Sequence, residues 1–356
     1  MSRDPIFPPD SQPFTPPCCP RPKCPSRTGQ PFRFILKGTY KRHCDGVEVQ
    51  RYRCQVCRRT FSTQTFRLSC GLRRPWLTGR IFDGFVSKVT MRQSARTIGC
   101  TRKTVAQRLR LIAHHCALTH AIVLERARRA GGLPGDFQLD ELETFEGSRR
   151  LQPVTMPVLI ELHTRFVVHV EVGTLPARGN LSKRDEARKI ELEAVHGKRT
   201  SESNAAVKAC FTVLKHVVPK GRHHVISTDR KPSYAKILRE LFKPPYTHAR
   251  HSSTTARTPN NPLFPINHTL AMMRDGMSRI VRRTWATTKK RERLSWHAWI
   301  WNGYRNYVRV LTNKARDISS ALALGVVTEH FTRKRFLRWK PIPLAFQAQP
   351  TGPVSE

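Results

Sequence analysis

The sequence predicts a mixed α/β fold for its central segment, and two observations support this prediction. Three consecutive β-rich runs, each bounded by turn or charged residues, occupy residues 137–145, 154–163 and 165–175; this pattern is typical of antiparallel strands. Beyond a polar insertion, a strand at 223–229 lies between helical runs at 203–218 and 233–242. Three strands followed by an alternation of strand and helix indicate a mixed sheet flanked by helices.

The balance of charge points to a polyanionic partner. The chain of 356 residues carries 64 Lys and Arg against 25 Asp and Glu, a formal net charge of +39, and 38% of its residues are hydrophobic. That length and apolar content suffice for two or three cores. The basic residues occur in every segment rather than in one tail or one amphipathic helix, which disfavours a membrane-surface protein. We therefore expect the partner to be a nucleic acid.

The two ends of the chain are rich in proline and polar residues. Residues 1–17 and 346–356 are therefore expected to be disordered tails. No run of about 18 apolar residues is present, and the start "MSRDPIFPPD" lacks the apolar core of a signal peptide. These features predict no membrane partner and a cytoplasmic, nucleoid-associated location, where ten cysteines favour metal binding or burial over disulfides.

The cysteine-bearing block at 18–66 has the spacing of a zinc ribbon. Two short loops each carry a pair of cysteines, with a β-like stretch between the pairs, and the four residues are Cys19, Cys24, Cys54 and Cys57. Four thiolates arranged in this way bind one Zn²⁺ tetrahedrally. Cys18 is an alternative to Cys19, Cys44 and His43 are also available, and burial without metal is the other interpretation.

The helical block at 75–130 predicts a helix-turn-helix. Ala95 lets two helices approach, Gly99 turns the chain, and Val105 seats the second helix on the first. The supporting helix is expected to carry Ile81, Phe85 and Val89 at helical spacing. The candidate DNA-binding residues on the outer face of the second helix are Thr101, Arg102, Lys103, Gln107 and Arg110. An ordinary helical hairpin is the alternative.

A cluster of acids is unexpected in so basic a chain. The stretch "QLDELETFE" carries four of them, Asp140, Glu141, Glu143 and Glu146. Asp140 lies in the first predicted strand and Asp229 at the end of the strand after the insertion, so the two converge if these strands are neighbours. For the three glutamates, ion pairs with arginines such as Arg149 and Arg150 are the simpler interpretation.

The order of these units resembles that of a bacterial insertion-sequence transposase of the DDE type. The likeness runs from about residue 18 to about residue 290, and its most informative segments are "RYRCQVCRRTFS", "FQLDELETF", "STDRKPSY" and "RIVRRTW". The resemblance implies a small zinc ribbon, a helix-turn-helix domain, an RNase H-like catalytic domain at 135–286 and a basic helical extension at 287–345. It further implies metal-dependent DNA strand cleavage and strand transfer by a homo-oligomer that holds double-stranded DNA of both the element ends and the target.

Metal-dependent phosphodiester chemistry accounts for the acids. In-line attack needs divalent ions, and carboxylates are the ligands that Mg²⁺ or Mn²⁺ prefers. On this interpretation Asp140 and Asp229 bind the catalytic metal. The resemblance places the third acidic position at Asn267, counted back from Arg279. Asn267 acts as a neutral ligand, Asp275 replaces it, or the copy is inactive.

Two rival functions remain compatible with the sequence. The first is a catalytically inactive or domesticated DNA-binding regulator, which the asparagine at the third position favours. The second is a stand-alone RNase H-like nuclease, which has less use for two DNA-recognition units. Two further sets are open between DNA contact and packing, with packing favoured; they are His248, Arg250 and His251, and the aromatic residues Trp296, Trp299, Trp301, Tyr304 and Tyr307.

Overall fold

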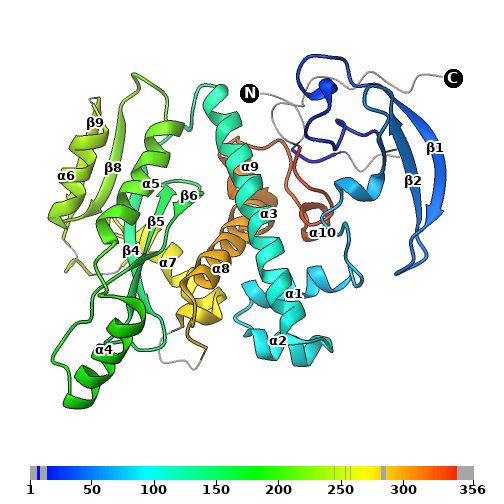
Figure 1. The fold of residues 1–356 in the computed structure, drawn as a ribbon. Helices are drawn as coiled ribbons and strands as arrows, with labels where there is room; N and C mark the ends of the chain where they lie inside the picture. Colours follow the sequence, from blue (N-terminus) through cyan, green and yellow to red (C-terminus); the bar gives the residue numbers. More distant parts are fainter. Residues whose placement is uncertain are drawn as a thin grey trace.

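A six-stranded mixed sheet forms the centre of the chain in the computed structural model, which describes residues 6–8, 14–243, 245–252, 254–256, 258–281 and 286–342 (Figure 1). Its strands are β4 (Phe137–Phe145), β5 (Pro153–Glu161), β6 (Val167–Val170), β7 (Gly173–Thr174), β8 (His224–Asp229) and β9 (Tyr246–His251). The order is β6-β5-β4-β8-β9, and β7 pairs with β5. Strands β4, β5 and β6 are antiparallel, whereas β8 is parallel to β4 and β9 is parallel to β8.

This topology confirms the predicted fold class. The first strand of the sheet lies beside the strand that follows the long insertion, which is the arrangement of an RNase H-like domain. The edge strand β9 was not predicted, because "YTHARH" has no alternation of apolar and polar residues. Within the insertion, α4 (Lys183–His196) forms a helix with no buried residue.

Helices cover both faces of the sheet, so alternate residues of β4 enter two different cores. On one face α5 (Ser203–Val217) and α6 (Pro232–Leu241) pack over Leu139. On the other face α7 (Phe264–Gly276) and α8 (Arg291–Gly303) pack over Leu142. Because successive side chains of a strand point to opposite faces, Asp140 belongs to the α7 face and Glu141 to the α5–α6 face.

Three antiparallel strands, β1 (Phe34–Lys41), β2 (Glu48–Cys54) and β3 (Thr60–Ser62), make up the N-terminal unit, with short helical turns η1 (Pro25–Arg27) and η2 (Thr63–Phe66). Within the tail expected over 1–17, several of the described residues pack against the rest of the chain. Phe7 is fully buried and meets Phe331 edge-on, and Phe14 stacks on Trp339 with ring centroids 4.7 Å apart. The other expected tail, 346–356, lies outside the described residues.

The helical unit contains α1 (Leu77–Val86), α2 (Met91–Ile98) and α3 (Arg102–Arg129). Gly99 ends α2 in the left-handed region (φ 71°), and Val105 is fully buried, as the turn and the seating of the second helix require. Helix α3 is 28 residues long and continues past this unit to pack on α5 and α8. In Figure 1 it runs between the sheet and the β1–β3 unit.

The C-terminal region is more than the helical extension that was predicted for 287–345. After the turn η3 (Ser278–Ile280) and α8, it contains a π-helical turn (Tyr304–Val308), the antiparallel pair β10 (Val310–Thr312) and β11 (Ala315–Ser319), α9 (Ser320–Ala323) and α10 (Arg333–Phe336). Trp301 and Tyr307 are fully buried, so these two aromatic residues pack rather than stack on bases. Among the described residues, no helix has the length and apolar character needed to cross a bilayer.

Candidate functional site

Asp140 and Asp229 lie on neighbouring parallel strands and on the same face of the sheet. The last pair of the β4–β8 ladder is Gln138↔Ser227. Each aspartate lies two residues beyond its member of this pair, and residues i and i+2 of a strand share a face. Both aspartates therefore belong to the face that α7 covers, at the same end of their strands.

Gln138 fastens the start of α7 to this face. Its side-chain amide donates to the carbonyl oxygen of Pro262 (2.7 Å), and its Oε1 accepts the N–H of Ile266 (3.1 Å). The next residue, Asn267, lines a cavity of about 310 Å³ together with Asp140. The other lining residues are Glu141, Phe264, His268, Leu270, Ala271 and Arg274. Asn267 is thus the residue through which α7 offers a side-chain oxygen beside Asp140, while Asp229 lies on the adjoining strand.

Glu141 is the centre of a polar network on the opposite face of β4. Its Oε1 accepts from the ammonium of Lys231 (2.6 Å) and the hydroxyl of Tyr234 (2.9 Å), and its Oε2 accepts from Thr155 (2.7 Å) and Ser203 (3.0 Å). Four donors satisfy the carboxylate, as a buried charge requires. The ion pair with Lys231 connects β4 to the turn after β8.

The charges of three carboxylates affect the pKa of one buried phenol, that of Tyr234. Burial and the negative charges of Glu141, Asp229 and Asp140 raise the pKa of Tyr234 well above its usual value. Tyr234 is almost completely buried, so water does not screen these charges strongly. Asp140, Glu141 and Asp229 thus all lie within electrostatic reach of the Tyr234 hydroxyl, in a chain of net charge +39.

Asp275 does not line the cavity that Asp140 and Asn267 share. It lies on the same helix as Asn267, but its side chain is 88% exposed and 3.7 Å from the ammonium of Lys88. It lines a different cavity, with Lys88 and Tyr304. Eight residues along an α-helix turn a side chain about 80° beyond two full turns, and the structure has Asp275 directed elsewhere accordingly.

The remaining glutamates of "QLDELETFE" form ion pairs, as the simpler interpretation held, but with other arginines. Glu143 pairs with Arg178 (2.7 Å) and Glu146 with Arg199 (2.9 Å). Arg150, one of the arginines named in the sequence analysis, lies 3.6 Å from Asp185 instead. The partners were missed because they lie beyond the next strands.

Asp140, Asp229 and Asn267 carry oxygen atoms of the kinds that a hard divalent cation binds. Carboxylate oxygens of Asp140 and Asp229 are ligands that Mg²⁺ or Mn²⁺ accepts, and the amide oxygen of Asn267 is a weaker neutral one. Backbone groups orient both acids, because the N–H of Glu141 donates to Asp140 Oδ1 (2.7 Å) and the N–H of Lys231 donates to Asp229 Oδ1 (3.0 Å). A divalent ion held by these residues would supply the positive charge that attacking and leaving phosphodiester oxygens need.

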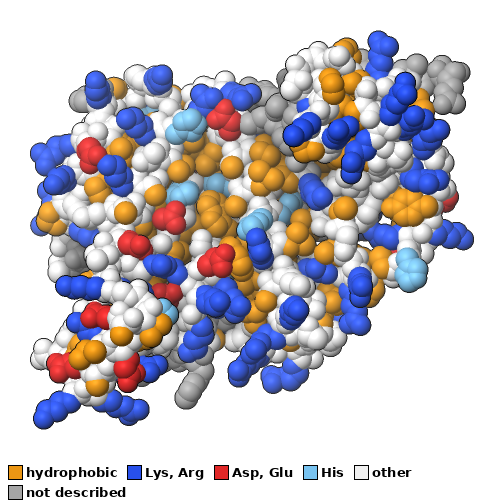
Figure 2. All heavy atoms as spheres, in the orientation of Figure 1, with side chains coloured by type: hydrophobic (Ala, Val, Ile, Leu, Met, Phe, Trp, Pro, Cys, Tyr) orange, Lys and Arg blue, Asp and Glu red, His pale blue; other side chains and the backbone are white. Residues whose placement is uncertain are grey.

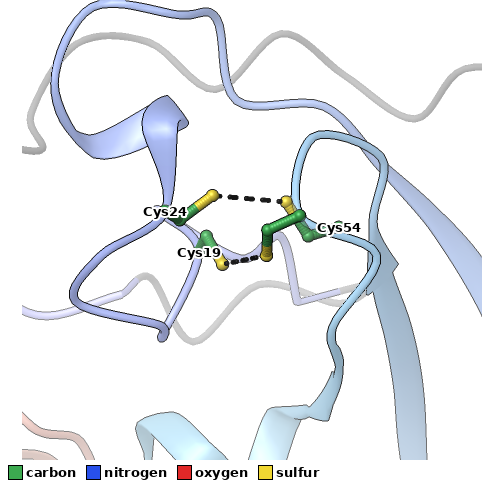
Figure 3. A group of neighbouring side chains, drawn as sticks. Cys19, Cys24 and Cys54 are labelled. Atoms are coloured by element: carbon green, nitrogen blue, oxygen red, sulfur yellow. Dashed lines mark hydrogen bonds between the residues drawn. The ribbon is translucent and has the colours of Figure 1, made fainter.

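The four predicted cysteines come together in the N-terminal unit (Figure 3). The sulfur atoms of Cys19 and Cys57 are 3.6 Å apart, those of Cys24 and Cys54 are 3.8 Å apart, and all four lie within 4.8 Å of one another. A tetrahedral zinc site with Zn–S bonds of about 2.3 Å has sulfur–sulfur edges of about 3.8 Å. The geometry fits Zn²⁺, and the alternatives Cys18, Cys44 and His43 are outside the group.

The five candidate DNA-binding residues all lie exposed on the first turns of α3; they are Thr101, Arg102, Lys103, Gln107 and Arg110. Thr101 also has a structural role, because it caps α3 by accepting the N–H of Thr104 (3.2 Å). The guanidinium of Arg110 lies 6.0 Å from the ring of Trp296 on α8. In Figure 2 basic side chains are spread over the whole visible face, while most of the acidic ones lie on the side of the sheet and α4.

Two residues of β9 that were open between DNA contact and packing have internal partners. His248 shares a hydrogen bond of 2.8 Å with the hydroxyl of Thr228, next to Asp229. Arg250 is exposed, and its guanidinium donates to the carbonyl oxygen of Arg230 (3.0 Å). His248 therefore belongs to the packing of β8 against β9, as favoured.

Comparison with known proteins gives no close relative. No protein-family model matches the chain, and none of the curated proteins compared with it matches. Among solved structures, the chain is similar to the catalytic domain of the Mos1 mariner transposase, with 15% identity and a TM-score of 0.23 over 55% of this chain and 85% of that one. It is also similar to the simian T-cell lymphotropic virus intasome in complex with PP2A regulatory subunit B56 gamma, with 16% identity and a TM-score of 0.23 over 78% of each chain.

Proposed function

We propose that the chain is a transposase that binds the ends of a mobile DNA element and carries out metal-dependent DNA strand cleavage and strand transfer. One observation carries the proposal: Asp140 and Asp229 lie at the same end of neighbouring strands, on the face of the sheet where Asn267 and Asp140 line a cavity. Carboxylates in this position serve phosphodiester chemistry, and the net charge of +39 suits a DNA partner.

Each unit of the chain has a part in this function. Asp140 and Asp229 hold Mg²⁺ or Mn²⁺, and Asn267 adds a neutral oxygen. The residues exposed at the start of α3 bind double-stranded DNA in the major groove, while the four-cysteine cluster holds Zn²⁺ and with it the β1–β3 unit. Reactions that join two element ends to a target need two copies, so the working form is a homo-oligomer in the cytoplasm, associated with the nucleoid.

The continuity of α3 gives this arrangement a mechanical basis. Its first turns expose Arg102 and Lys103, while its later turns pack on α5 and α8, which cover the sheet. A helix of 28 residues is about 42 Å long. DNA held at the start of α3 is thus fixed relative to the catalytic sheet by one rigid element.

The test is strand cleavage by the purified full chain. The substrate is a supercoiled plasmid that carries the gene with its flanking DNA, incubated with Mg²⁺ or Mn²⁺ and, as a blank, with EDTA. Asp140→Asn and Asp229→Asn should each abolish nicking, whereas Asp275→Asn, a change on the exposed side of α7, should leave it intact. Normal nicking by either of the first two variants would refute the proposal.

A DNA-binding regulator without catalysis is the second candidate, and Asn267 is the observation that favours it. A neutral amide at the third position binds Mg²⁺ more weakly than a carboxylate. In the same assay a regulator would shift DNA in a gel but would nick it under none of the metal conditions. Nicking by the wild-type chain decides against this candidate.

A further inference from the structure

Beside the carboxylate cavity lies a second, larger cavity whose charged lining is mainly arginine. It has a volume of about 700 Å³, and its charged lining residues are Glu143, Arg149, Arg178 and Arg274. Thr144 and Phe145 at the end of β4 and Ile280 and Val281 after α7 complete the wall. We call it the arginine cavity.

The two cavities adjoin each other through one side chain. Arg274 lines both the arginine cavity and the cavity that holds Asp140 and Asn267. Strand β4 runs along both, with Asp140 at one and Thr144 at the other. Four residues of a strand span about 13 Å, a length that a few nucleotides of a DNA strand can bridge.

The chemistry of the arginine cavity suits phosphodiester groups. Guanidinium groups bind phosphate oxygens in a bidentate manner and stay charged at all relevant pH values. Among the described residues that line the cavity, Glu143 is the one acid, and it pairs with Arg178 at 2.7 Å. About half of each of these two side chains is exposed, so the pair can open toward a stronger anion at small cost.

We propose that the arginine cavity binds backbone phosphates of the DNA strand a few nucleotides from the phosphodiester that lies at Asp140. This inference rests on the proposed function, which places a DNA strand at Asp140. It adds the residues that hold the neighbouring part of that DNA strand. Arg149 and Arg178 bind the phosphates. Arg274 lies where the DNA strand passes from one cavity to the other. Glu143 limits the grip, because its charge competes with phosphate for Arg178.

The experiment measures DNA binding by the full chain without metal, so that catalysis does not enter. Fluorescence anisotropy with a labelled 30-base-pair duplex gives the affinity at several KCl concentrations. The logarithm of the binding constant falls linearly as the logarithm of the salt concentration rises. Removing one ion pair between an arginine and a phosphate lowers the magnitude of this slope by about 0.9. The double variant Arg149→Gln and Arg178→Gln should therefore lower the slope by about 2. Arg150→Gln is the matched control, since Arg150 is the sequence neighbour, similarly exposed, and pairs with Asp185 outside the cavity.

Glu143→Gln supplies a change of opposite sign. It releases Arg178 and removes a negative charge from the lining, so affinity should rise several-fold at low salt, a result that misfolding would not produce. A slope for the double variant equal to that of the control, or no gain with Glu143→Gln, overturns the inference. If the slopes change as expected but the wild-type chain never nicks DNA, phosphate binding by the arginine cavity is supported and the transposase proposal fails. If the wild-type chain nicks DNA but the slopes do not change, the transposase proposal is supported and phosphate binding by the arginine cavity fails.

Discussion

Lys231 and Glu141 form an ion pair of 2.6 Å that joins the two strands carrying the candidate metal ligands. Glu141 follows Asp140 on β4, and the backbone N–H of Lys231 donates to Asp229. Lys231 thus connects the two strand ends. Its ammonium donates to Glu141, the neighbour of Asp140, and its backbone N–H donates to Asp229. Because the β4–β8 ladder ends at Gln138↔Ser227, this connection holds the strand ends where pairing no longer does.

Glu141→Gln is expected to destabilise the fold and to weaken metal binding. Removing one partner leaves the other charge uncompensated, which costs about 3–5 kcal/mol for a fully buried pair. Since the side chain of Lys231 is 35% exposed, we expect a loss of about 1–3 kcal/mol in the free energy of unfolding. Urea unfolding measures the stability, and titration calorimetry with Mn²⁺ measures the affinity.

Glu143→Gln is the matched control, because Glu143 lies on the same strand and its partner Arg178 is about half exposed. Its stability should stay within about 0.5 kcal/mol of the wild type, and its affinity for Mn²⁺ should not change. If Glu141→Gln loses stability but keeps full Mn²⁺ affinity, the network holds the fold without positioning the aspartates.

Asn267→Asp should raise the affinity for Mn²⁺ by about tenfold or more. A third carboxylate replaces a neutral amide oxygen at the wall that Asn267 shares with Asp140, and a tenfold gain corresponds to about 1.4 kcal/mol. Calorimetry on the full chain gives the two dissociation constants. An unchanged constant would mean that the side chain at this position does not reach the ion. Asp275→Asn, on the exposed side of the same helix, should have no effect.

Parts of this site are visible in the sequence because their signals are local. Asp140 and Asp229 each occur within a β-rich run, and the short spacing within each cysteine pair indicates a zinc site. Gly99 is similar, because a turn between two helices needs a residue that tolerates positive φ.

The Glu141 network could not be predicted because its members are distant in the chain. Ser203, Lys231 and Tyr234 lie 62, 90 and 93 residues beyond Glu141, and only the folded sheet brings them to one carboxylate. The same reason applies to Phe7, which proline-rich neighbours made look disordered although it packs against Phe331 in the C-terminal region.

Removal of zinc should disorder the N-terminal unit and leave the sheet intact. Cys54→Ser is expected to lower the metal content from about one zinc ion per chain to none, because structural zinc sites provide about 10–16 kcal/mol and fold together with their metal. Zinc analysis gives the content, and near-UV circular dichroism reports the packing of Tyr52 against Phe34 and Phe61. Cys70→Ser changes an exposed cysteine outside the cluster and should retain both zinc and spectrum; loss of zinc from this control alone would place the site elsewhere.

The fold should lose stability as the pH falls below about 6.5, because three histidines are buried in the neutral form. Burial lowers the pKa of His115 and His120 to about 4, and burial together with the charge of Arg279 lowers that of His297 to about 3. In the unfolded chain these histidines bind protons near pH 6.5, whereas in the folded chain they bind protons only at lower pH. Their contribution is therefore complete above pH 6.5 and disappears as the pH falls toward 4.

Each such histidine adds about 1.4 kcal/mol per pH unit to the slope of unfolding free energy within that window. His297→Gln removes one titrating group while keeping a donor for the carbonyl oxygen of Phe85, which lies 2.6 Å from Nε2 of His297. Urea unfolding between pH 6 and 5, within that window, should show a slope that is shallower by about that amount. His223→Gln, at an exposed histidine, should keep the wild-type slope. Equal slopes for wild type and His297→Gln would mean that His297 takes up its proton in the folded protein as readily as in the unfolded chain.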